Sequence, residues 1–171
     1  MDNKKNNLPL SPDELIADYR LGYRSRKASI IGRLEVLTDK AKFVIFGYGK
    51  ELPHLAIART FGKGDLRSVY YLDQTWMMAL DLLTLEEFFA QLYAHADPDF
   101  DPNSGGRNMN EHFSTQLIDE DGNWLNQTER YNSSADIAPT AAHMPRAVGL
   151  AYASALYRKN AELKKFDNFS H

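Results

Sequence analysis

The feature that most constrains this chain is a helix start at Ser11-Pro12-Asp13-Glu14. A serine N-cap, a proline at the first helical position and acids in the first turn are typical of a helix start, and Glu14 stands in capping-box register with Ser11. Apolar residues then recur at roughly helical spacing at Leu15, Ile16, Tyr19, Tyr23, Ile30, Leu34 and Leu37. The pattern predicts one long amphipathic helix over about 12–38, with a bend near residues 22 or 29.

Basic residues gather on this predicted helix, at Arg20, Arg24, Arg26, Lys27 and Arg33. Such a cluster can form a nucleic-acid-binding face, but the net charge of the whole chain is −3. We therefore favour a solvated or subunit-facing helix surface, and we expect neither nucleic acid nor a membrane as a partner.

The rest of the pattern predicts an α/β chain rich in helix. Residues 42–46 are strand-like, and helical patterns cover 50–61, 74–83, 84–96 and 140–160. Residues 66–73 should be extended or form a tight turn, and 114–132 a small hairpin around Asp121-Gly122. The last helix is rich in alanine, which lets another backbone come close, so we expect it to be buried against a helix or sheet.

The length of 171 residues suits one domain with a real core, and the chain contains no cysteine. Residues 1–11 are mostly polar, and we expect a disordered tail there. No apolar run approaches the ~18 residues that a membrane-spanning helix needs, so we expect a soluble, cytoplasmic protein.

The segment GGRNMNEHFS, Gly105 to Ser114, has the composition of a functional loop. Its glycines let the backbone approach another group closely, while Arg107 and His112 can bind anions and move protons. Residues 97–110, which overlap the start of this segment, show neither helical nor strand periodicity, and this predicts a mobile loop. A plain surface loop explains the same composition. Because the five histidines show no metal-ligand spacing, the residues alone indicate an α/β or α-rich soluble domain with one candidate site.

Four segments, taken in order, resemble a known family. They are GYGKELPHLAIA at 47–58, SVYYLDQTWMMALDLLTLEEFFAQLYA at 68–94, GGRNMNEHF at 105–113 and APTAAHMPRAVGLAYASALYR at 138–158. Together they resemble the α part of thiamine diphosphate-dependent 2-oxo acid dehydrogenases, of the branched-chain (2-oxoisovalerate) type. The resemblance covers about residues 12–160, and the order of the motifs makes it specific.

The resemblance implies a thiamine diphosphate-binding fold and the decarboxylation of a 2-oxo acid, with transfer of the acyl group to a lipoyl partner. It places Tyr71 against the diphosphate of the cofactor. It also places the turn at Ala138, Pro139 and Thr140 against the cofactor, and Arg107 and His112 on a loop at the mouth of the active site as candidate catalytic residues. The implied partners are the β part of the dehydrogenase, fused or separate, a lipoyl acyltransferase and further copies of the chain.

The chain departs from the family pattern at several positions. Leu72 stands where an arginine usually follows the tyrosine, Ala138 replaces a usual serine, and His143 a usual glutamine. The Gly-Asp-Gly magnesium motif does not occur. We therefore interpret residues 12–171 as an incomplete thiamine diphosphate-binding domain that ends before the magnesium ligands and is inactive alone.

Two other interpretations remain open. A non-catalytic paralogue could keep the fold as a subunit-interaction scaffold, and the loss of an arginine at position 72 favours that interpretation. An unrelated helical binding module is the third. Which 2-oxo acid is used, and whether the departures abolish cofactor binding, the sequence leaves open.

Overall fold

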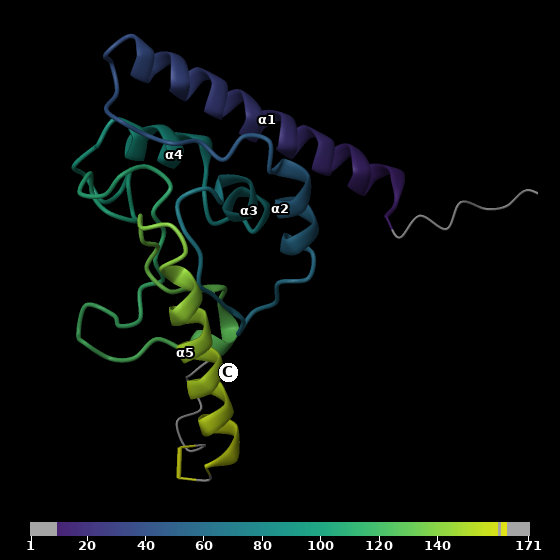
Figure 1. Ribbon diagram of the computed structural model, residues 1–171, viewed down its shortest axis with the longest axis vertical. Coiled ribbons are helices and arrows are strands. Elements are labelled where there is room, and N and C mark those ends of the chain that lie inside the picture. Colours follow the sequence, from purple (N-terminus) through teal and green to yellow (C-terminus); the bar gives the residue numbers. More distant parts are fainter. Residues whose placement is uncertain (1–9, 161, 164–171) are drawn as a thin grey trace, which may run out of the picture.

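The computed structural model describes residues 10–160, 162 and 163, and it shows a helix-rich chain with a two-stranded parallel sheet (Figure 1). This is compatible with the expected mixed α/β class. The expected disordered tail at 1–11 lies, for residues 1–9, outside the described residues. The elements, in order, are α1 (Pro12–Leu37), α2 (Glu51–Ala58), β1 (Leu66–Arg67), α3 (Gln74–Ala79), α4 (Leu85–Leu92), the 3₁₀ turn η1 (Gln127–Glu129), β2 (Asn132–Ser133) and α5 (His143–Lys159).

The long first helix is confirmed. The Ser11 hydroxyl accepts from the Glu14 N–H at 3.2 Å, and the Glu14 carboxylate accepts from the Ser11 N–H at 2.8 Å, which forms the expected capping box. The buried residues of α1 are all small, namely Ser25, Ala28, Ser29 and Gly32. This small face lets α1 lie close against α3, where Ser25 and Thr75 share a hydrogen bond of 2.6 Å.

The three short helices are confirmed, although each ends earlier than its pattern predicts. Residues in the left-handed region follow two of them, Asp81 (φ 56°) after α3 and Ala94 (φ 54°) after α4. Such a conformation cannot continue a helix. The start of α4 carries the expected capping box between Thr84 and Glu87.

The predicted strand at 42–46 is wrong. Its residues belong to no strand, and most of their side chains are exposed or half-buried. The preference of Val and Ile for strands depends on packing against a neighbouring strand. No described segment pairs with this one, and Phe46 instead packs on the hydrophobic core.

The small sheet joins segments that are distant in the chain. β1 pairs in parallel with β2, in the register Leu66 with Asn132 and Arg67 with Ser133. The Asn132 amide closes this junction by donating to the carbonyls of Gln127, Arg130 and Asp65. The expected hairpin around residues 121–122 is reduced to one antiparallel bridge, between Ile118 and Trp124.

The hydrophobic core lies between α1, α3 and α4 and the segment that contains Phe113. Phe88 and Phe113 are its most buried large residues, at 0% and 1% exposed. The methionines of α3 fill the space between them. The core cluster comprises Ala28, Met77, Met78, Leu83, Phe88 and Phe113.

The last helix, α5, is not buried as its small residues predict. It extends away from the other helices at the end of the molecule opposite α1 (Figure 1), and none of its residues is buried. Its alanines border a groove of about 520 Å³ that is closed on the other side by Phe61, Leu66 and Gln127. The described chain provides no element that covers the rest of this face. No helix in the described part of the chain is long and apolar enough to cross a membrane.

Candidate functional site

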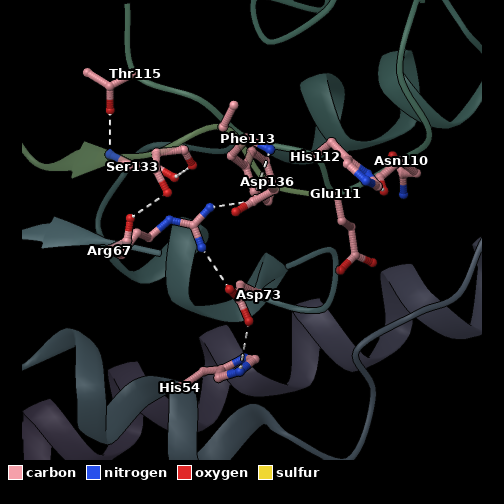
Figure 2. A network of polar contacts seen from close by, with 12 residues as sticks. His54, Arg67, Asp73, Asn110, Glu111, His112, Phe113, Thr115, Ser133 and Asp136 are labelled. Carbon is pink, nitrogen blue, oxygen red and sulfur yellow. Dashed lines mark hydrogen bonds and ion pairs between the residues drawn. The ribbon is translucent and has the colours of Figure 1, made fainter. Parts of the chain in front are cut away.

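A buried ion network lies beneath the segment that follows β1 (Figure 2). Arg67 Nη1 donates to Asp73 Oδ2 at 2.7 Å, and Arg67 Nη2 donates to Asp136 Oδ2 at 2.6 Å. The Asp136 carboxylate also accepts from the Phe113 N–H at 3.1 Å. The three charged side chains are between 0% and 7% exposed. The network therefore ties β1, α3 and the segment before α5 into one unit.

Burial shifts the protonation of this network. It raises the pKa of Asp73 to about 6, although the charge of Arg67 opposes the rise. Burial also raises the pKa of Asp136. His54 Nε2 lies 3.5 Å from Asp73 Oδ1, and burial together with the charge of Lys50 lowers the pKa of His54 to about 4. At neutral pH the histidine is therefore neutral, while Asp73 is mostly ionised.

Glu111 is a further buried acid close to this network. Its side chain is fully buried, and neither carboxylate oxygen has a hydrogen-bond partner among the described residues. Burial, followed by the charge of Asp73, raises its pKa well above the ordinary value. The backbone N–H groups of Gln74 and Gly47 oppose this rise in pKa. Burial therefore favours the neutral, protonated form of Glu111 over the carboxylate.

A row of aromatic and imidazole rings lies next to these acids. The rings of Tyr71 and His112 stack with centroids 5.6 Å apart and an interplanar angle of 12°. Tyr70 packs edge-on against Tyr71 at 5.1 Å and stacks on His143 at 5.2 Å and 5°. All four side chains are half-buried. We call these four residues the ring row, and they offer flat surfaces, hydroxyls and imidazole nitrogens to a ligand.

Two groups fix the chemistry of the ring row. Lys50 Nζ donates to the Tyr70 hydroxyl at 3.3 Å, and it lies 5.3 Å from the centre of the Tyr70 ring. His112 Nδ1 lies 3.0 Å from the carbonyl oxygen of Met109. When Nδ1 carries the proton it donates to that carbonyl, which leaves Nε2 free to accept a proton. A cation, Lys50, and a base, His112, thus lie together at the ring row.

Backbone packing sets the position of Tyr71. A side chain added at Gly47 would collide with the carbonyl of Leu72, so the glycine lets these two segments touch. Gly106, at φ 75°, lies against Ala94 in the same manner, where an added Cβ would be 2.6 Å from the Ala94 carbonyl oxygen. Both glycines therefore permit close approach of the backbone.

The structure brings together some of the predicted site residues and separates others. Tyr71 and His112 are in contact through their rings. Arg107 is exposed and donates to the carbonyl of Ser104 in its own turn at 3.2 Å, and no described contact joins it to Tyr71 or His112. The turn at Ala138, Pro139 and Thr140 is exposed. The ring of His143, a few residues further on, connects that region to the row through Tyr70.

Sequence reasoning missed the buried acids and Arg67. Arg67, Asp73 and Asp136 form no motif, and Glu111 lies beside His112 in the segment 105–114 without itself being singled out. The one available signal was the presence of two charged residues, Arg67 and Asp73, in the extended segment LRSVYYLD, residues 66–73. A cation there predicts a buried acidic partner, but not which acid.

The residues of the ring row can be tested against thiamine diphosphate. Lys50 and the tyrosine hydroxyls suit a doubly charged anion, and buried His143 Nδ1 has no hydrogen-bond partner in the described chain. Leu72 offers no charge, and both terminal nitrogens of Arg67 are occupied by carboxylates. Thiamine diphosphate therefore fits at the ring row, with the neighbouring Lys50 as the cation that would bind its diphosphate. In the described part of the chain, no three histidine, aspartate or glutamate side chains are grouped to hold a metal ion.

Neither a scan of the chain against protein-family models nor a search of curated proteins finds a match.

Proposed function

We propose that the chain is the N-terminal segment of the decarboxylating component of a thiamine diphosphate-dependent 2-oxo acid dehydrogenase, of the branched-chain type. The stacking of Tyr71 on His112 supports this proposal. The family resemblance places both residues close to the cofactor, although they come from separate segments of the chain. Their contact is the arrangement that a shared site requires.

In this proposal the residues of the chain bind and orient. The Tyr71 hydroxyl and the Lys50 ammonium would hold the diphosphate, while the turn from Ala138 to Thr140 would lie against the cofactor. His112 Nε2 would accept or return a proton at the mouth of the site. Arg107 would bind the carboxylate of the 2-oxo acid when the loop orders. Thiamine diphosphate, when bound, supplies the carbon nucleophile and the electron sink for decarboxylation.

Other parts of the assembly would complete the site. The magnesium ligands would lie outside this chain, and the β part would supply the group that activates the cofactor. The acyl product would pass to a lipoyl acyltransferase. The proposed reaction implies a soluble, cytoplasmic multienzyme complex, and this chain alone would be inactive.

A second candidate function is a non-catalytic scaffold that keeps the fold for subunit interaction. Two observations favour it. Leu72 removes a charge-assisted contact worth about 1.5–3 kcal/mol. In addition, Asp73 and Asp136 are buried near the ring row and share Arg67 as their paired cation, and ionised acids oppose the binding of a diphosphate.

Titration calorimetry separates the two functions. Thiamine diphosphate with magnesium is titrated into the protein assembled with its β part, and binding supports the enzyme. Tyr71→Phe should weaken that binding. Tyr93→Phe serves as the matched control, because it removes a hydroxyl that contacts Glu35 away from the ring row. No binding by the assembled wild type rejects the enzyme in favour of the scaffold, and tight binding by this chain alone shows that the site is misplaced.

A further inference from the structure

The first helix presents its large apolar side chains to solvent. Its buried face consists of the small residues Ser25, Ala28, Ser29 and Gly32. Six larger apolar residues on the other side are 48% to 73% exposed. We call these six residues the outer stripe. They are Ile16, Tyr19, Tyr23, Ile30, Leu34 and Leu37.

The outer stripe lies along one side of the helix, as two apolar groups at residues 16–23 and 30–37 that flank Arg26 and Lys27. At 100° per residue its six positions fall within a sector about 60° wide, on the side of the helix opposite the buried residues. The helix of 26 residues is about 39 Å long, and the stripe runs along most of it. Scattered exposed apolar residues are common in monomers, but six large apolar side chains aligned on one side of a helix mark an interface.

We infer that the outer stripe binds the outer stripe of a second copy of this chain in antiparallel orientation. The stripe is symmetric about a point between Arg26 and Lys27. When two copies cross there in antiparallel orientation, Ile16 comes level with Leu37, Tyr19 with Leu34, and Tyr23 with Ile30. Each contact thus joins two different apolar side chains of the two copies. A parallel pair would instead place every residue against itself.

Two basic residues lie next to the centre of the stripe, Arg26 and Lys27. Arg26 is held by Glu51 through two hydrogen bonds of 2.6 and 2.7 Å, which neutralise it. The ammonium of Lys27 lies 5.4 Å from the centre of the Tyr23 ring of its own chain. Antiparallel helices also place opposite dipole ends together.

Lys27 is the weakest point of the proposed interface. Its position lies almost at the symmetry centre, so the two Lys27 side chains meet there, and a charged residue in an apolar helix seam lowers its stability. Lys27→Leu should therefore tighten the dimer by about tenfold or more, an effect that a solvated position would not produce.

Cysteine cross-linking tests the orientation, because the chain contains no cysteine of its own. Under mild oxidation Lys27→Cys should link to itself across the centre. An equimolar mixture of Ile16→Cys and Leu37→Cys chains should give the mixed dimer. Leu37→Cys alone should stay unlinked, because its two copies would be roughly 30 Å apart along the helices at 1.5 Å per residue.

Light scattering at tens of micromolar tests the interface itself. The wild type should be a dimer, and the double variant Tyr19→Asp/Leu34→Asp should be a monomer with an unchanged circular dichroism spectrum. Val148→Asp is the matched control, because Val148 is 70% exposed on α5, and it should leave the dimer intact. A monomeric wild type, ready self-linking of Leu37→Cys, or a dimer lost only with Val148→Asp would each overturn the inference.

Discussion

Arg67 Nη2 lies 2.6 Å from Asp136 Oδ2, and the two side chains are 2% and 0% exposed. The same guanidinium binds Asp73 at 2.7 Å. One buried cation therefore forms ion pairs with two buried carboxylates. An ion pair of this kind contributes little net stability over an apolar core, yet loss of a single partner leaves an uncompensated charge. The network is expected to be sensitive to the change of any one member.

Arg67→Met should lower the free energy of unfolding at pH 7 by about 3–5 kcal/mol, because it leaves two carboxylates buried without a cation. Denaturation in urea measures this loss. The triple variant Arg67→Met/Asp73→Leu/Asp136→Leu should recover part of it. Lys40→Ala removes an exposed ion pair with Glu35 and should cost no more than about 1 kcal/mol. A cost of that size for Arg67→Met would contradict the proposed role of the network.

Glu111→Gln should make the chain more resistant to alkaline pH. A carboxyl whose pKa is higher in the folded chain than in the unfolded chain stabilises the fold fully below its unfolded pKa, and this contribution is lost as the pH rises through the folded pKa. The pKa of Glu111 is raised well above the ordinary value, so the wild type should lose stability relative to the variant from about pH 5 upward. Urea midpoints between pH 5 and pH 9 should diverge. Parallel curves would show that Glu111 is not buried as a neutral acid.

His54→Gln tests a contribution to the stability of the fold that has the opposite dependence on pH. A histidine whose pKa is lowered on folding stabilises the fold above its unfolded pKa, and this contribution is lost as the pH falls toward about 4. Asp73, with a raised pKa of about 6, gives the opposite dependence over much of the same range. The two therefore largely cancel in the wild type. The variant should become relatively more stable as the pH falls from 6.5 to 4, as followed by thermal unfolding, and an unchanged pH profile would exclude the buried neutral imidazole.

Leu72→Arg should tighten the binding of thiamine diphosphate to the assembled protein by roughly tenfold, or about 1.4 kcal/mol. The substitution restores the cation that the family usually carries after its tyrosine. Lys50→Met should weaken binding, since Lys50 is the cation that contacts Tyr70 of the ring row. Calorimetry on both variants measures the effects. If Lys50→Met binds as the wild type does, the diphosphate does not lie at this row.

Asp101→Ala should loosen residues 97–110. We expect residues 97–110 to be mobile or displaced when no cofactor is bound, but the buried Asp101 carboxylate accepts hydrogen bonds from Asn103, Ser104 and Gly106. Amide exchange in the wild type should therefore be slower at Ser104 and Gly106 than at Asp99, and the substitution should abolish the difference. Uniformly slow exchange over the whole loop would contradict its predicted mobility.

Local signals predicted much of this fold. The capping residues Ser11 and Thr84 fixed where two helices begin, because a cap depends on residues within one turn. The pattern at 42–46 failed because a strand needs a partner that local sequence does not reveal. Helical spacing likewise identified the apolar face of α1 but not its outward direction, since the buried face consists of small residues.

The candidate site was predictable in part. The resemblance pointed to Tyr71 and His112, and the structure places their rings in contact. It also pointed to Arg107, which lies on its own turn away from them. Arg67 and Asp136 could not be paired from sequence, because neither belongs to a motif and the contact forms only when β1 meets β2.

The parallel pairing of β1 with β2 also bears on how the chain folds. Leu66 cannot meet Asn132 until the whole segment between them has been synthesised and ordered, and long-range parallel contacts of this kind slow folding. Until then Arg67 and Asp136 remain apart and hydrated. Final closure of the molecule therefore waits for a late segment, and the helices made first stay open to chaperones and proteases during translation.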